Sequence, residues 1–202
     1  MGCTVEVTGG TSSSHRSIER LFVGREATFS RFLDDSELTR VNGSRSDAVF
    51  VSEEFARAVG VALDAERATD GVVTPLVHDA LVSAGYDRSL HSLRPIERRA
   101  AGRVPSVRRH VQVTGRLVGR RRGARLDLAG VVKGMTVDAA TALLDGPGFV
   151  SAGGDIAVTT PTIIELPGGG SIALHAGGVA TSGTTTRRWL DADGRVNHHL
   201  VD

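Results

Sequence analysis

The stretch Leu126-Asp127-Leu128-Ala129-Gly130-Val131-Val132-Lys133-Gly134 joins an apolar, extended segment to the start of a helix. The pattern predicts a strand over residues 124–128, a tight turn at Ala129 and Gly130, and a helix over residues 131–144. Residues 149–158 follow as strand, glycine pair and strand, and residues 163–175 as a hairpin around a turn at 167–170. Helices and hairpins are therefore grouped and do not alternate, which predicts an α+β fold rather than a doubly wound parallel sheet.

The rest of the chain adds helices before this stretch and strands on both sides of it. Ser36 and Ser52 stand where helix N-caps are expected, and Ser52 precedes two acidic residues and an apolar face. We expect helices at 14–32, 52–69 and 76–84, and a short helical turn at 36–43. We expect strands at 4–8, 110–113, 115–118, 163–166, 172–175 and 177–183, with an irregular loop and a weak strand within 88–109. The sequence thus predicts antiparallel or mixed sheets flanked by helices, in a single domain over residues 1–202.

The composition excludes several classes of protein. Apolar residues make up 40% and charged residues 23% of the 202, with a net charge of +1, as is ordinary for a globular chain with its own core. The low aromatic content of 4% disfavours a stacking surface for nucleic-acid bases. Cys3 is the only cysteine, so no internal disulfide forms, and no apolar run reaches the roughly 18 residues of a transmembrane helix. Without a leader pattern, the chain as given is predicted to be cytoplasmic.

The basic residues are unevenly distributed along the chain. Lys133 is the only lysine among 24 basic residues, and twelve arginines lie between Arg88 and Arg125. Such a run has two interpretations, an anion or nucleic-acid patch and a solvated surface. The near-neutral total charge and the lack of interleaved aromatic residues favour a solvated surface, and no nucleic-acid partner is expected.

The segment from Leu126 to Gly134 also has the chemistry of an anion site. Free N–H groups at a helix start suit a phosphate, and Lys133, one turn into the helix, adds a positive charge. Small residues allow close approach of the backbone, and an exposed carbonyl there is a possible metal ligand. The spacing is not that of a P-loop, so a phosphate site and an ordinary strand–turn–helix remain equally open.

Three further segments carry polar groups whose meaning the local pattern leaves open. Asp155 follows two glycines at a strand kink, which is typical either of a functional acid or of a β-bulge with a satisfied carboxylate. Residues 181–184 offer hydroxyl and N–H groups, as either an anion nest or a simple turn. His198 and His199 near the C-terminus have no further residues at zinc-ligand spacing, and no Gly-x-Ser-x-Gly elbow supports a hydrolase.

Taken together, seven segments follow one another in a characteristic order. They are Met1-Gly2-Cys3-Thr4, Ser30-x-Phe32-x-x-x-Ser36-Glu37-Leu38-x-x-x-Asn42, Asp70-Gly71-Val72-Val73-Thr74-Pro75 through Gly85-Tyr86-Asp87, Asp127-Leu128-Ala129-Gly130-Val131-Val132-Lys133-Gly134, Gly153-Gly154-Asp155, Thr181-Ser182-Gly183 and His199-Leu200-Val201-Asp202. In this order the chain resembles the FAD:protein FMN transferases, the ApbE family. The resemblance spans the whole chain.

The resemblance implies a Mg²⁺-dependent enzyme that transfers FMN from FAD to a threonine hydroxyl of a target flavoprotein and releases AMP. The family pattern places catalytic groups at Lys133 and His199 and a metal-ligating backbone carbonyl at Gly130. It places cofactor contacts at Met1, Phe32, Val72, Val73, Thr74, Asp127, Lys133, Ser182 and Val201. The expected partners are FAD and the acceptor flavoprotein.

The sequence also departs from the family pattern. Val73 and Thr74 stand where the family usually has Phe and Asp, and Cys3 stands where it has Thr. The chain stops at Asp202, before the segment in which the family carries its remaining metal ligands, so we expect little FMN transfer from residues 1–202 until that continuation is restored. The alternative function is therefore a flavin-binding protein, or an FAD pyrophosphatase, without transferase activity.

Overall fold

A computed structural model describes residues 2–93, 104–107, 110–166 and 168–200. The chain forms two compact units. The first unit contains Cys3–Glu26 and Val132–Ser182, and the second contains Ala27–Val131 and Gly183–Asp202. Each unit is built from segments that are distant in the sequence, so long-range contacts hold both together. None of the helices in the described part of the chain is both long and apolar enough to cross a bilayer.

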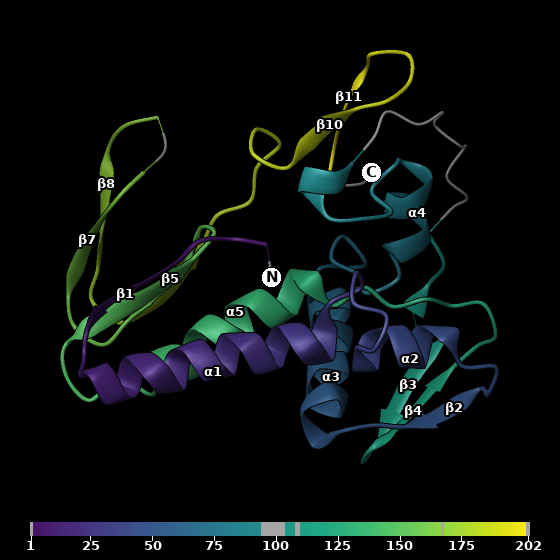
Figure 1. Ribbon diagram of the computed structural model, residues 1–202, viewed down its shortest axis with the longest axis horizontal. Coiled ribbons are helices and arrows are strands. Elements are labelled where there is room, and N and C mark those ends of the chain that lie inside the picture. Colours follow the sequence, from purple (N-terminus) through teal and green to yellow (C-terminus); the bar gives the residue numbers. More distant parts are fainter. Residues whose placement is uncertain (1, 94–103, 108–109, 167, 201–202) are drawn as a thin grey trace. The chain divides into compact units, whose positions relative to one another are not determined.

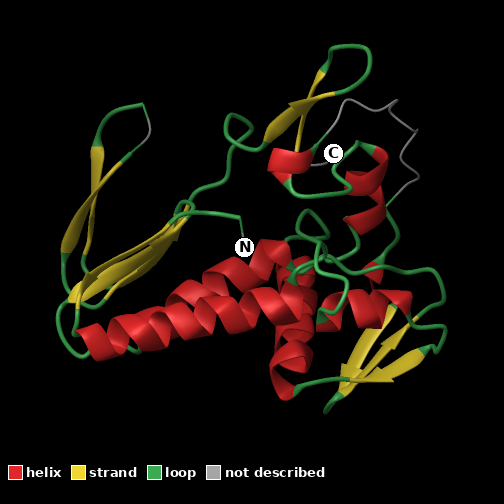
Figure 2. Cartoon of the chain, viewed as in Figure 1, coloured by secondary structure: helices red, strands yellow, loops and turns green. Residues whose placement is uncertain are grey.

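The first unit is an antiparallel sheet covered by two helices (Figures 1 and 2). The four strands have the order β1-β5-β6-β9, and each neighbouring pair is antiparallel. Their bounds are β1 Val5–Gly9, β5 Gly148–Ala152, β6 Asp155–Val158 and β9 Gly177–Ala180. The helices are α1 Ser12–Phe29 and α5 Ala129–Thr141, and a hairpin of β7 Thr162–Glu165 and β8 Ser171–Leu174 follows β6.

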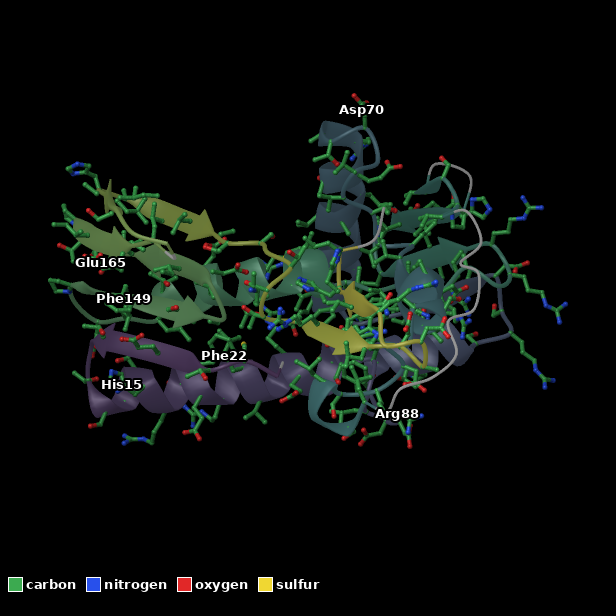
Figure 3. The ribbon with its side chains drawn as sticks, turned by 90° about the horizontal axis from the view of Figure 1, so that it is seen from above. His15, Phe22, Asp70, Arg88, Phe149 and Glu165 are labelled. Carbon is green, nitrogen blue, oxygen red and sulfur yellow. The ribbon has the colours of Figure 1, made fainter. Side chains whose placement is uncertain are left out.

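The core of the first unit lies between this sheet and the two helices. Buried residues of the sheet and of both helices form one cluster of Ile18, Phe22, Val137, Ala140, Val150, Ala152 and Ala157. Phe22, which is labelled in Figure 3, is one turn of α1 away from Ile18, so both side chains face the sheet. Along β5, burial alternates so that Val150 and Ala152 point into the core. The apolar residues at helical spacing in α1 and α5 and at alternate positions in β5 therefore pack together in one core.

The second unit combines short helices with two small antiparallel sheets. Its helices are α2 Glu37–Gly43, α3 Glu53–Ala68, α4 His78–Ser83 and a 3₁₀ turn η1 Leu90–Ser92. A three-stranded sheet has the order β2-β4-β3, with β2 Ala48–Phe50, β3 Val111–Thr114 and β4 Leu117–Arg120. A hairpin of β10 Arg188–Leu190 and β11 Val196–His198 completes it.

The two predicted N-caps are present and are linked to each other. The Ser36 hydroxyl accepts a hydrogen bond from the Thr39 N–H at the start of α2, and the Ser52 hydroxyl accepts one from the Phe55 N–H at the start of α3. Glu37 in the first turn of α2 accepts hydrogen bonds from both the N–H and the hydroxyl of Ser52, at 2.7 and 2.6 Å. One glutamate therefore holds the N-termini of two helices together.

Helix α3 ends where the sequence predicts. Asp70, labelled in Figure 3, has a φ of +49°, and Gly71 has a φ of +88°. This left-handed turn brings the Gly71 N–H to the Glu66 carbonyl oxygen at 2.9 Å. The turn is an ordinary helix C-cap and directs the chain into the loop that precedes Pro75.

The α+β fold with antiparallel sheets is confirmed, and most predicted elements are present with ends shifted by a few residues. The strand expected at residues 124–128 is wrong, because this segment joins no sheet and has no regular secondary structure. Strands β2, β10 and β11 are additional elements that the sequence pattern did not indicate. Of the loop expected at 88–109, the stretches 94–103 and 108–109 lie outside the described residues.

Strand β1 ends and strand β5 begins at a glycine pair where neither strand has room for a side chain. Gly9 pairs with Gly148, and a Cβ atom on Gly148 would lie 2.0 Å from the Thr8 carbonyl oxygen. A Cβ atom on Gly9 would lie 2.0 Å from the Pro147 carbonyl oxygen. Both obstacles are backbone atoms, which cannot move aside as a flexible side chain does.

We predict that Gly148→Ala lowers the free energy of unfolding by about 1–3 kcal/mol, the usual cost of overpacking a rigid site. Gly146→Ala is the matched control, because a Cβ atom there meets nothing within 4 Å. That variant is expected to stay within about 0.5 kcal/mol of the unaltered chain. Denaturant unfolding followed by circular dichroism measures both, and equal stability of the two variants would contradict the prediction.

Candidate functional site

The predicted site residues divide between the two units. Phe32, Val72, Val73, Thr74, Asp127, Gly130 and His199 belong to the second unit, and Lys133 and Ser182 belong to the first. Met1 and Val201 lie outside the described residues. The two groups are described in turn.

Asp127 is the most highly connected predicted residue of the second unit. One carboxylate oxygen accepts a hydrogen bond of 2.9 Å from the Ala129 N–H, which is the first N–H group of α5. The other oxygen lies 3.4 Å from Nε of Arg31, and the side chains of this ion pair are only 5% and 8% exposed. The Asp127 N–H donates to the Pro75 carbonyl oxygen at 2.8 Å. Asp127 therefore fixes the start of α5 and ties it to two other predicted motifs.

Asn42 explains why residues 124–128 are extended without belonging to a sheet. Its side-chain amide donates to the Leu126 carbonyl oxygen and its side-chain oxygen accepts from the Leu126 N–H, both at 2.8 Å. These two bonds replace the pair that a neighbouring strand would make. Leu126 is fully buried, so its backbone groups need these partners.

The predicted flavin contacts of the second unit include apolar side chains that solvent reaches. Phe32 is 37% exposed, Val73 38% and Val72 86%. A ligand-contact residue has to be accessible, and these residues meet that condition while the core residues around them do not. The Thr74 hydroxyl accepts a hydrogen bond of 3.3 Å from the Leu76 N–H, and so orders the loop just before α4.

The buried ring of Tyr86 packs against the exposed ring of Phe32. The two rings have centroids 5.6 Å apart and are tilted by 58°, and Tyr86 stacks in turn on Trp189 of β10 at 5.0 Å. The Trp189 indole N–H donates to the Ala84 carbonyl oxygen at 2.8 Å. The neighbouring Asp87 accepts hydrogen bonds from Arg88, which lower the pKa of the Asp87 carboxyl. The aromatic residues form an ordered row that ends at the exposed Phe32 ring.

Gly130 is the second residue of α5 and is exposed, with no atom near the position of a Cβ. A phosphate or a metal ion therefore has steric access to this backbone. Among the described residues, no three His, Cys, Asp or Glu side chains come together as a metal cluster. The described side chains thus do not form a protein cage for Mg²⁺, and the Gly130 carbonyl is the single ligand that the resemblance assigns.

In the first unit, Lys133 meets the glycine pair. Its ammonium group donates to the Gly153 carbonyl oxygen at 2.9 Å and lies 3.1 Å from a carboxylate oxygen of Asp155. The side chains are 20% and 14% exposed. An ammonium group has three N–H donors, so one remains for a ligand after these two contacts. Asp155 is a satisfied carboxylate, and its partner is the only lysine of the chain.

Gly153 and Gly154 form the tight turn between β5 and β6, not a bulge. Ala152 pairs with Asp155, so the loop has two residues, with φ values of +54° and +95°. A Cβ atom on Gly153 would lie 2.8 Å from Cβ of Cys3, and one on Gly154 would lie 3.2 Å from Cβ of Thr181. The turn therefore packs closely against two other predicted motifs.

The sheet register brings the Thr181-Ser182 segment to the same turn. Asp155 pairs with Ala180 of β9, and the Thr181 N–H donates to the Gly154 carbonyl oxygen at 2.9 Å. Ser182 follows directly and is exposed. A cavity of about 290 Å³ lies beside this group and is lined by Gly134, Asp138, Asp155 and residues of β6 and β9. The structure thus gathers three of the predicted motifs in the first unit.

His199 directly follows β11 and is half-buried, in the second unit. No described contact tests its predicted catalytic role, which stays a prediction. Arg31, by contrast, contacts predicted site residues although the sequence pattern left its position unassigned. Its place between Ser30 and Phe32 of a predicted motif is the signal that would have drawn attention to it.

The comparisons with known proteins agree with one another. The model of the ApbE family matches residues 1–202. The structure is similar to the ApbE protein of Thermotoga maritima, with a TM-score of 0.79 and 25% identity over 98% of this chain and 71% of that one. It is also similar to the apo flavinyl transferase ApbE of Pseudomonas stutzeri, with a TM-score of 0.68 and 17% identity over 91% and 70% of the two chains. The flavin transferase ApbE of Vibrio cholerae is similar with a TM-score of 0.65 and 20% identity, over 86% of this chain and 64% of that one. A search of curated proteins gives no significant match.

We predict that Asn42→Asp destabilises the chain by about 1–3 kcal/mol, because a carboxylate cannot donate to the buried Leu126 carbonyl group. Gln112→Glu is the matched control, since it makes the same change from amide to acid on an exposed side chain. Thermal unfolding at neutral pH compares the two. A loss for Asn42→Asp no larger than that of the control would show that the bridge to Leu126 is dispensable.

Proposed function

The chain belongs to the ApbE family, and from that premise we propose that it is a flavin transferase that moves FMN from FAD to a threonine hydroxyl of an acceptor flavoprotein. The observation that carries the proposal is the convergence of the family's motifs. In the first unit, Lys133 contacts the Gly153-Asp155 turn, which Thr181 also contacts. In the second unit, Asp127 contacts Arg31 beside Phe32 and the carbonyl group of Pro75.

The reaction exchanges one phosphorus–oxygen bond for another. The acceptor hydroxyl oxygen bonds to the phosphorus of the FMN half of FAD, the bond to the AMP half breaks, and AMP leaves with the electron pair. The hydroxyl proton goes to a base, and we propose His199, since an imidazole titrates near neutral pH. We propose Lys133 as a charge that faces the phosphates, because one of its three donors is left after the contacts with Gly153 and Asp155.

FAD supplies the phosphoanhydride bond, and Mg²⁺ when bound would neutralise charge on the phosphates. In this proposal the residues of the chain bind FAD and orient its phosphates and its flavin ring. The positive end of the α5 dipole suits a phosphate, and Asp127 holds the first turn of this helix in place through the Ala129 N–H. The exposed Phe32, Val72 and Val73 offer apolar contact area for the flavin ring.

The test is a reaction of the chain with FAD, Mg²⁺ and a threonine-containing acceptor peptide, analysed by intact mass and by chromatography of nucleotides. Any FMN that the chain transfers, even at the low rate expected of residues 1–202, should add one FMN to the peptide for each AMP released. A peptide with valine in place of threonine is the control and is expected to remain unmodified. Bound FAD with an unmodified threonine peptide would favour a flavin-binding protein, and free FMN together with free AMP would favour a pyrophosphatase.

We predict that the chain binds FAD more tightly than riboflavin, because only a phosphorylated flavin engages Lys133 and the start of α5. Lys133→Ala should weaken FAD binding by about 1–3 kcal/mol, the scale of a charge-assisted hydrogen bond, and leave riboflavin binding unchanged. Arg67→Ala is the control, since it removes an exposed ion pair with Asp64. Calorimetric titration measures all of these affinities, and equal affinity for FAD and riboflavin would overturn the prediction.

A further inference from the structure

Arg31 is a buried arginine of the second unit that contacts its neighbour Phe32 and residues of two distant segments. Its side chain is 8% exposed, and its Nε atom lies 3.4 Å from a carboxylate oxygen of Asp127. Its guanidinium carbon lies 4.6 Å from the centre of the Phe32 ring and 4.3 Å from the centre of the Tyr86 ring. One planar group therefore joins two aromatic rings to the carboxylate at the start of α5.

The aromatic contacts continue beyond Tyr86, because Trp189 stacks on the Tyr86 ring at a centroid distance of 5.0 Å and an interplanar angle of 26°. Trp189 is the only tryptophan of the chain, and Tyr86 is the only tyrosine. A change in the packing of Arg31 is therefore expected to be visible in the near-ultraviolet spectrum without any ligand.

The hydrogen bonds of Arg31 are incomplete. Its Nη2 atom is buried and has no hydrogen-bond partner in the described part of the chain. A buried guanidinium with an unused donor is unfavourable, and an apolar side chain of similar length would fill the same space without that cost. Only arginine, however, stacks on two rings and holds a carboxylate with the same rigid plane. Packing alone therefore does not account for arginine at this position.

We propose that Arg31 is a positioning residue of the flavin site, which holds the Phe32 ring and the Asp127 carboxylate in one fixed arrangement. The inference rests on the proposed function, because that function assigns Phe32 and Asp127 to the flavin. Arg31 acts through these two residues. Asp127 in turn fixes the first N–H group of α5, so the effect of Arg31 extends to the turn that contains Gly130.

The experiment compares Arg31→Lys with Arg116→Lys in the full chain. Lysine keeps the positive charge but loses the plane and the fork of the guanidinium. Arg116 is the matched control, because its guanidinium lies 4.5 Å from the Phe50 ring centre and its Nε donates to the Val51 carbonyl oxygen at 2.9 Å. Its partners carry no predicted site role. The measurements are thermal unfolding, the near-ultraviolet circular dichroism of the ligand-free chain, FAD affinity, and kcat and KM for FMN transfer.

We expect Arg31→Lys to alter the near-ultraviolet spectrum and to weaken FAD binding about tenfold or more, the effect of a small misplacement of contact groups. We expect KM for FAD to rise by a larger factor than kcat falls, and Arg116→Lys to show none of these changes. In the double variant Arg31→Lys with Asp127→Asn, the loss of FAD-binding free energy should be smaller than the sum of the losses in the two single variants. The reason is that Arg31 acts through Asp127, so the two changes remove part of the same effect.

Unchanged FAD binding in Arg31→Lys, an equal loss in Arg116→Lys, or full additivity with Asp127→Asn would each overturn the inference. If Arg31→Lys does not fold, Arg31→Met replaces it, since methionine fills the space without charge, and the same loss is expected. Failure of the unaltered chain to bind FAD would overturn the proposed function and this inference with it. Flavin binding that ignores the identity of residue 31 would overturn this inference alone.

Discussion

The carboxylate of Asp127 is the constraint on which the second unit of this protein depends. Its two oxygens serve different partners, the first N–H group of α5 and the guanidinium of Arg31, and the side chain is almost fully buried. A buried carboxylate is tolerated only where hydrogen bonds and an opposite charge compensate for lost hydration. Because the Asp127 N–H also bonds to the Pro75 carbonyl oxygen, one residue holds the start of α5, the loop before α4 and the turn that follows α1.

The sequence predicted the elements that depend on local signals. Ser36 and Ser52 cap helices because a hydroxyl reaches an N–H group three residues away, and this geometry is encoded within one turn of chain. The glycine pair at residues 153 and 154 marked the break between two strands, where both residues have a positive φ, although the sequence pattern favoured a bulge over the tight turn that is present. Such features need no knowledge of distant residues, and they were sufficient to indicate an α+β fold.

The failures lie where the partner is distant in the sequence. Residues 124–128 look like a strand because Leu126 and Leu128 are buried and extended, but the partner is the side chain of Asn42 and not a strand. The ion pair of Lys133 with Asp155 joins α5 to β6, and the pattern alone indicated an anion-facing lysine without this partner. Arg31 was missed for the same reason, since its three contacts come from one neighbour and two distant segments. Local periodicity cannot report contacts of this kind.

The departure from the family pattern at Thr74 is compatible with this network. Where the family usually has an aspartate, Thr74 accepts a hydrogen bond from the Leu76 N–H two residues later. Aspartate and threonine both make this local bond, so the turn around Pro75 does not require a carboxylate. The turn presents the Pro75 carbonyl group to the Asp127 N–H at 2.8 Å. A threonine at this position is therefore sufficient to order the turn whose carbonyl group holds Asp127, and it does so without placing a negative charge in the loop.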